Sequence, residues 1–256
     1  MVGFDRHPLL TRFGLPGWAL AERPPTRAAL QTQLVLPARL KLVDPPSDGL
    51  HYEQRIATRG EIATRADSWH DAFNALMWSR WPLLKAALNR RQAADLHCHG
   101  PQQRSRAQMA ITHFDESGVI VVTRERALLE AWARHDWAGL FVAARAAWSD
   151  DVQIWPVGHA LLEHLKLEPH LLLTAKAIAV QCETLDLPSP AMLDRLLATA
   201  MDSLAILADP QHPRPLPVSG IPAAWHPQDA AFYADAPCFR PLRPGRIYAE
   251  PLRWCG

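Results

Sequence analysis

Cysteine is scarce in this chain, and its placement excludes two common kinds of site. The 256-residue sequence has 4 cysteines, at Cys98, Cys182, Cys238 and Cys255. No two of them form a CxxC pair, so the sequence contains neither a zinc knuckle nor a dithiol redox motif. A chain of this length buries about 70 to 75 % of its unfolded surface, so it needs no disulfide for stability. We expect a reducing, cytoplasmic location.

An excess of charge of one sign is also missing. The 27 basic and 26 acidic residues give a formal net charge of +1. The electrostatic footprint of a nucleic-acid binder is therefore absent, and a nucleic-acid partner is not favoured. The most apolar run, residues 171–180, is short and carries Lys176. This pattern, and an N-terminus without the basic-then-apolar order of a signal peptide, predicts no membrane partner.

Several catalytic motifs are absent as well. The sequence has no GxxxxGK or GxGxxG loop to hold phosphates, and no GxSxG nucleophile elbow. We therefore expect no nucleotide cofactor and no serine nucleophile of the usual kind.

Proline, by contrast, is abundant and unevenly placed. The 23 prolines gather near both ends of the chain, and proline fixes φ and donates no backbone hydrogen bond. We predict a single globular domain that is mainly α with a small β-hairpin, an α+β class. Residues 1–50 would form a proline-rich arm packed on the domain, 51–209 a helical core, and 210–256 a proline-rich extension.

Helical periodicity runs from residue 67 to residue 92, with Asp67 or Ser68 as the N-cap. Pro82 interrupts it, so we expect either a kink or two helices with Pro82 in the first turn of the second. Such a break would separate Lys85 from the helix face that carries His70 and Asn74, which are four residues apart.

Other segments have weaker patterns. Residues 109–123 are predicted to form the hairpin, with Asp115 and Gly118 in its turn and Gly118 in the left-handed conformation. Further helices are predicted over 124–148, 159–166, 170–182 and 190–207.

The densest group of possible chemistry lies between Thr58 and Asn89. Polar side chains of several different types lie there among large aromatic residues, and this mixture is typical of the lining of a cavity. In this hypothesis the catalytic residues are His70, Glu61 and Asp115, and the substrate-binding residues are Arg59, Asn74, Lys85, Trp69 and Trp81. The alternative is that Arg59 and Glu61 are ordinary surface charges, Asp115 lies in a solvated turn, and His70 at the helix start bonds a neighbouring carboxylate.

A divalent metal is a possible cofactor. His159 and Glu163 are four residues apart, so one helix face would carry both. The order differs from the HExxH signature of zinc hydrolases, so an ion pair on the helix surface is the competing interpretation.

The ordered motifs resemble those of a bacterial family catalogued as domain of unknown function 3025. They include Thr58–Ile62, Trp69–Leu76, Lys85–Asn89, Phe114–Gly118, Gly158–Glu163, Leu173–Lys176 and Pro217–Pro222. The resemblance runs from about Leu50 to Pro241 and implies that these separate motifs belong to one domain. It implies no particular activity. A fainter similarity of His70–Trp78 to HNH-type nucleases would require a catalytic histidine on an upstream strand.

Two classes of function follow. The first is a hydrolase-type enzyme that acts on an anionic substrate through a His, Asn, Arg and Glu site. The second is a non-catalytic protein that binds a protein or nucleic-acid partner through exposed tryptophan and arginine. Convergence of the predicted residues on one cavity would favour the enzyme.

Overall fold

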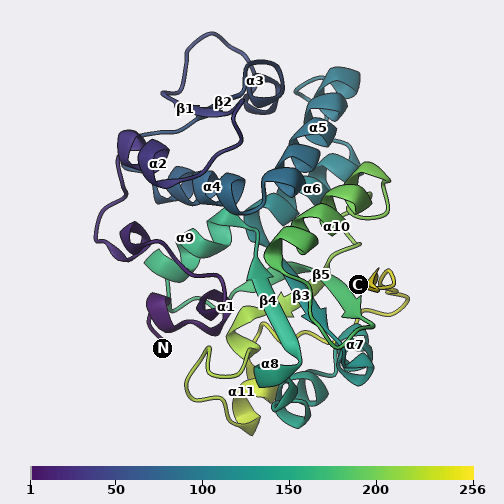
Figure 1. The fold of residues 1–256 in the computed structure, drawn as a ribbon. Helices are drawn as coiled ribbons and strands as arrows, with labels where there is room; N and C mark the ends of the chain where they lie inside the picture. The colour runs from purple at the N-terminus through teal and green to yellow at the C-terminus, as the bar shows by residue number, and fades with distance from the viewer. Residues whose placement is uncertain (1) are drawn as a thin grey trace.

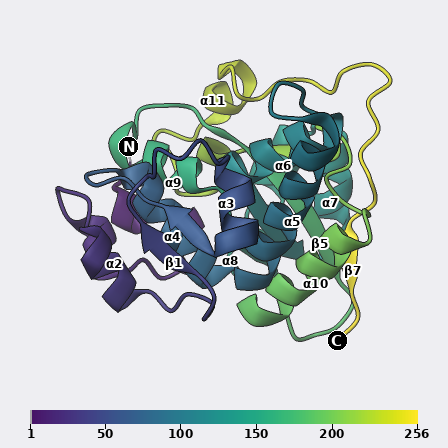
Figure 2. The same ribbon diagram turned by 90° about the horizontal axis from the view of Figure 1, so that it is seen from above.

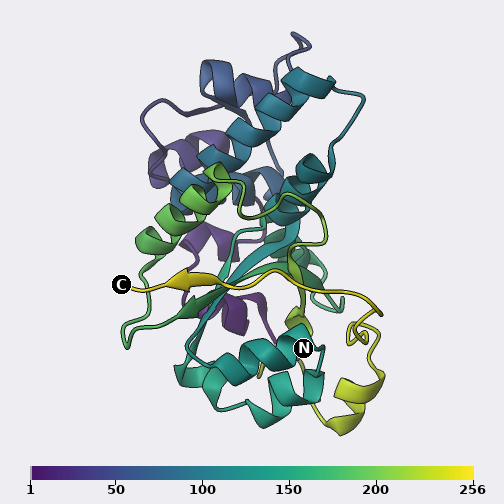
Figure 3. The same ribbon diagram turned by 90° about the vertical axis from the view of Figure 1, so that its right-hand side faces the viewer.

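A mixed β-sheet lies at the centre of the computed structural model, which describes residues 2–256 (Figure 1). Its strands lie in the order β4 (Val152–Pro156), β3 (Gly118–Thr123), β5 (Thr174–Cys182) and β6 (Arg214–Pro217), and β7 (Leu252–Trp254) also pairs with β5. β5 is parallel to β3 and β7 and antiparallel to β6, and β4 is antiparallel to β3. Figure 3 shows β7, in yellow, lying alongside this sheet.

Helices cover the sheet and connect its strands. One group packs together in the upper and middle part of Figure 1 and comprises α4 (Trp69–Arg80), α5 (Pro82–His99), α6 (Arg106–Ser117), α9 (His159–Leu167) and α10 (Pro190–Asp202). Of these, α6 packs directly on β3 and β5, and α9 packs on both α4 and α6. The shorter α7 (Arg126–Ala133), α8 (Ala147–Asp150) and α11 (Ala230–Asp235) lie toward the opposite end.

A smaller unit near the N-terminus packs against α4 and α5. It contains α2 (Arg27–Gln33) and two parallel strands, β1 (Lys41–Val43) and β2 (Glu61–Ala63), joined through α3 (Tyr52–Arg59), while α1 (Pro8–Thr11) contacts β4. Gly60 ends α3 at φ 67°, and a Cβ there would lie 2.0 Å from the Arg39 carbonyl oxygen. Figure 2 shows α3 beside α5, the arrangement that brings Tyr52 and Glu53 toward the helical core.

The predicted break at Pro82 is confirmed. Ser68 caps α4 by accepting a hydrogen bond from the Asp71 backbone N–H at 3.2 Å. Trp81 leaves the helical conformation with ψ 54°, and Pro82 begins α5 at its first position. Proline is favoured there because the missing N–H would have no helical partner.

The predicted hairpin over 109–123 is wrong. Ser105 caps α6, which buries Ala110, Ile111 and Phe114 on one face and passes directly into β3. Gly118 has φ −73°, so it does not adopt the left-handed conformation. Every residue of β3 is buried, so both of its faces are covered, and such a strand shows no alternation in sequence.

The helix predicted over 170–182 is also wrong. This segment forms β5, which is buried on most positions between β3 and β6. The alanines of this segment favour a helix, but pairing with β3, β6 and β7 stabilises the extended conformation instead. The predicted helix over 124–148 is divided among α7, a π-helical turn at Gly139–Ala143 and α8. The predicted helix over 159–166 is confirmed as α9, and the one predicted over 190–207 is confirmed as α10 up to Asp202, where it ends early.

The α+β class is therefore correct, although the sheet is larger than a hairpin. Both chain ends contribute regular structure, and the division into arms at 1–50 and 210–256 stays a prediction. Across residues 2–256, no helix combines the length and the apolar character that a membrane crossing requires.

Candidate metal centre

A cavity of about 330 Å³ lies among α3, α4, α5, α6 and α9. We call it the His–Glu cavity. Its polar walls are formed by Tyr52, Glu53, Arg65, His70, Asp71, Asn74, Gln92, Thr112, Asp115, Glu116 and His159. Titratable groups of both signs therefore converge from segments that are distant in sequence.

Helix ends bring the central residues together. His70 lies in the first turn of α4, Glu116 in the last turn of α6, and His159 is the first residue of α9. Gly158 permits this approach, since a Cβ on it would lie 2.4 Å from the Gly118 nitrogen and 2.5 Å from the Glu116 carbonyl oxygen. A side chain at position 158 would push α9 away from α6.

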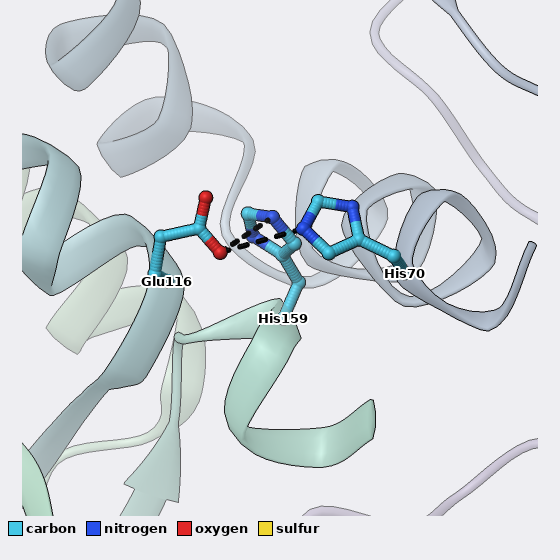
Figure 4. A group of neighbouring side chains, drawn as sticks. All are labelled: His70, Glu116 and His159. Carbon is cyan, nitrogen blue, oxygen red and sulfur yellow. Dashed lines mark ion pairs between the residues drawn. The ribbon is translucent and has the colours of Figure 1, made fainter. Parts of the chain in front are cut away.

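Three side chains point toward one another from these ends (Figure 4). Glu116 Oε2 lies 3.4 Å from His70 Nε2 and 3.4 Å from His159 Nε2. One ligand atom from each of the three side chains lies within 4.8 Å of the other two. The imidazole of His159 is buried, whereas the His70 imidazole and the Glu116 carboxylate are partly exposed.

Each imidazole also faces a second carboxylate through its other nitrogen. His70 Nδ1 lies 3.2 Å from Asp71 Oδ1, and Arg65 holds Asp71 through two guanidinium hydrogen bonds of 2.8 and 3.0 Å. His159 Nδ1 lies 4.0 Å from Asp115 Oδ2 and, in the described chain, is a buried nitrogen without a hydrogen-bond partner. The contact with Asp71 holds the His70 ring with Nε2 toward Glu116, whereas Asp115 lies near His159 without a hydrogen bond to it.

Lys85 joins the same network across the helix break. Its Nζ lies 2.5 Å from Asp115 Oδ1 and donates to Asn74 Oδ1 at 3.0 Å. Asn74 in turn donates to the Tyr52 hydroxyl at 2.7 Å. The expectation that Pro82 separates Lys85 from Asn74 is therefore wrong, because the Lys85 side chain reaches Asn74 across the break.

The electrostatics of the cavity differ between its two histidines. Hydrogen bonds with Asp71 and Glu116 raise the pKa of His70 to about 9, and the bond with His70 lowers the pKa of Glu116. Burial lowers the pKa of His159 to about 4, which favours its neutral form. Burial, with the charge of Asp115, raises the pKa of Glu53 to about 7.

The donor set fits a divalent transition metal. Two imidazole nitrogens and one carboxylate oxygen are a ligand combination of catalytic zinc sites and of non-haem iron sites. The carboxylates of Asp71 and Asp115 lie where outer partners of metal-bound histidines usually lie. His70, Glu116 and His159 could therefore hold such a metal at the cavity wall.

The structure brings five of the proposed site residues to one place: His70, Asn74, Lys85, Asp115 and His159. Asp115 lies in α6 rather than in a solvated turn, because the hairpin does not form.

Other proposed residues lie elsewhere. Arg59 Nη1 pairs with Asp48 at 2.6 Å, and Glu61 pairs with Arg55 at 2.8 Å. Both pairs lie in the segment that contains α3 and β2, and neither Arg59 nor Glu61 lines the cavity in the described chain. Glu163 is not among the cavity-lining residues of the described chain, although its charge acts on His70.

The tryptophans belong to the core. Trp69 is 6 % exposed and stacks on Phe73, and Trp81 is 1 % exposed and donates from Nε1 to the Pro156 carbonyl at 2.9 Å. Trp78 is 1 % exposed as well. These side chains cannot form the exposed aromatic surface that the binding hypothesis required.

Sequence reasoning missed Glu116 as a ligand and Tyr52, Glu53 and Arg65 as wall residues. Position 116 falls within the predicted hairpin turn, so the sequence does not predict the contact of Glu116 with the two histidines. Helical spacing of Ala110, Ile111 and Phe114 after Ser105 was the signal that could have placed it on α6. The HNH similarity fails, since β2, the strand before α4, carries no histidine.

The fold and the site together define an α+β protein with a candidate centre for a divalent metal. The chain belongs to the family described as protein of unknown function (DUF3025), whose model matches residues 41–243. The resemblance seen in the sequence is thus confirmed over most of the chain. Neither the curated proteins nor the solved structures include a significant match.

Proposed function

We propose that this protein is a hydrolase that depends on a divalent metal held by His70, Glu116 and His159. The observation that carries the proposal is the meeting of their three ligand atoms within 4.8 Å at the wall of a cavity of about 330 Å³. Three protein ligands leave coordination positions free for water and substrate, as in catalytic zinc sites. Such a metal activates water and polarises an ester or phosphoryl oxygen.

The surrounding charges support a hydrolytic role. Asp71 is neutralised by Arg65, and Asp115 by Lys85. Asp71 can therefore orient His70 without adding net negative charge, and the site would still gain positive charge from a bound metal. That charge would attract an anionic substrate, and the Arg65 side chain, 63 % exposed, lies at the same cavity.

Glu53 is our candidate for proton transfer. It lines the same cavity, and Asn89 Nδ2 donates to its carboxylate at 2.6 Å. A general acid or base works best when its pKa lies near the working pH, and the pKa of Glu53 is about 7. The Tyr52 hydroxyl, held by Asn74, would position substrate beside it.

Metal binding is tested first. The purified protein, stripped with a chelator, is titrated with Zn²⁺, Mn²⁺ and Co²⁺. We expect one tight site whose affinity falls at least about 100-fold in His159→Ala and Glu116→Gln, since changing only a residue that hydrogen-bonds a metal ligand costs about 10- to 100-fold. The controls are His164→Ala and His113→Ala, which remove exposed histidines from α9 and α6. Equal affinity in all four variants would contradict the site.

Turnover is tested separately with a chromogenic phosphomonoester, a phosphodiester and a carboxylic ester. We expect metal-dependent hydrolysis of at least one phosphoester, and a loss of kcat in Glu53→Gln that leaves the metal affinity unchanged. Tight metal binding without hydrolysis of any of these esters would contradict the hydrolase and leave the metal centre standing.

A further inference from the structure

A second and larger cavity, of about 750 Å³, lies between the start of β5 and the C-terminal segment. We call it the basic cleft. Its cationic side chains are Lys176, Arg240, Arg243 and Arg246, and no Asp or Glu stands among its lining residues in the described chain. We propose that the basic cleft binds a small anion that carries phosphoryl groups.

The cations of the basic cleft have no carboxylate partners. Elsewhere, surface arginines pair closely, as Arg106 does with Asp209 at 2.6 Å. Within residues 2–256, none of the four cleft cations forms an ion pair within 4.0 Å. Gathering like charges without a counterion raises the electrostatic energy, and a multiply charged anion would remove that cost. Burial and the charge of Arg246 also lower the pKa of Lys176.

Part of the basic cleft is held in place before any ligand binds. Arg246 Nη1 donates to Gln211 Oε1 at 2.6 Å, and its guanidinium lies 4.6 Å from the centre of the Tyr248 ring. The Tyr248 hydroxyl lies 2.9 Å from His135 Nε2, and His135 Nδ1 lies 3.0 Å from the Arg240 carbonyl oxygen. These contacts tie the C-terminal segment to the end of α7 and limit the motion of the arginines. A fixed guanidinium loses less entropy when it binds an anion.

The chemistry of the walls selects the ligand class. Guanidinium groups present paired donors that match phosphoryl oxygens, and lysine adds a point charge. A volume of about 750 Å³ lies within the range of small-molecule sites. The net charge of +1 argues against an extended nucleic-acid footprint beyond the cleft. The two cavities share no lining residue, so this site is separate from the proposed metal centre.

Titration calorimetry with inorganic pyrophosphate tests the proposal on the chelator-treated full chain. Two variants reduce the cleft charge: Arg243→Gln, which changes an exposed side chain, and the double variant Lys176→Met with Arg246→Gln. The control is Arg126→Gln with Arg253→Gln, which removes two positive charges outside the cleft. Circular dichroism and thermal unfolding establish that each variant is folded.

We expect saturable binding of one pyrophosphate, weakened about tenfold or more by the double cleft variant and severalfold by Arg243→Gln, because charge-assisted hydrogen bonds are lost. The control should change affinity less than about twofold, since exposed charges are screened. No saturable binding, or equal weakening by the control, would overturn the proposal. Tighter binding of an oligothymidylate, growing with its length, would overturn the assignment to a small ligand.

Discussion

The His–Glu cavity and the basic cleft differ in whether their charged side chains form ion pairs. In the His–Glu cavity, helix ends from the core bring carboxylates and cations into direct contact, as with Lys85 and Asp115 at 2.5 Å. In the basic cleft, the cations come from β5 and the C-terminal segment, and they remain unpaired in the described chain. The comparison teaches that paired charges in the first region stabilise the fold around the proposed site, whereas the cations of the second form no ion pairs in the described chain.

Among substitutions that test this difference, Lys85→Met should cause the largest loss of stability. The side chain is 4 % exposed, so Lys85→Met would leave Asp115 buried without its partner. We expect the free energy of unfolding to fall by about 3 to 5 kcal/mol. The control, Lys41→Met, removes an exposed lysine whose ion pair with Glu61 is worth about 0 to 1 kcal/mol. Urea denaturation measures both, and equal losses would contradict the buried network.

Gly158→Ala should have the next largest effect. The added Cβ would meet backbone atoms at 2.4 and 2.5 Å, so α9 must shift away from α6. We expect a loss of about 1 to 3 kcal/mol, typical of overpacking, and weaker metal binding through displacement of His159. The control is Gly17→Ala, where a Cβ would meet nothing within 4 Å. Unfolding and metal titration of the two variants give the test, which fails if Gly158→Ala behaves like its control.

The Glu53 carboxyl should make the stability of the protein depend on pH. Because its pKa rises from 4.5 to about 7 on folding, the folded state keeps the proton that the unfolded state releases. This contribution to stability is present at low pH and is lost as pH rises from about 4.5 to about 7. The urea midpoint of the metal-free protein should therefore fall more between pH 5 and pH 8 than that of Glu53→Gln. Glu22→Gln, at an exposed position, should keep the wild-type slope. Parallel slopes in all three proteins would refute the assignment.

The smallest expected effect lies in the basic cleft. Arg243→Gln removes an exposed charge without an ion pair in the described chain, so stability should change by less than about 0.5 kcal/mol. Thermal unfolding at low ionic strength measures the change. A destabilisation comparable to that of Lys85→Met would contradict the claim that only the charges of the His–Glu cavity contribute to stability.

Local signals in the sequence predicted part of the fold. Pro82 and Ser68 act on their own turns, so the α4–α5 break and the α4 cap could be read directly. β3 and β5 depend on partners far along the chain, and their buried apolar runs have no alternation to identify them.

The candidate site was predicted in part for the same reason. His70 and Asn74 share a helix face, so spacing alone associates them. Glu116 and His159 reach that face only through the packing of α6 and α9, which no local pattern encodes. Arg59 and Glu61 are near His70 in sequence. In the structure, however, Arg59 pairs with Asp48 and Glu61 pairs with Arg55, outside the cavity.

Anomalous diffraction from crystals grown with Zn²⁺ would test the central claim most directly. We predict one strong peak bonded to His70 Nε2, His159 Nε2 and a Glu116 carboxylate oxygen at distances typical of zinc, about 2.0 to 2.2 Å. A Zn²⁺ peak only at other residues, or an intact His70–Glu116–His159 cluster without a peak, would contradict the account.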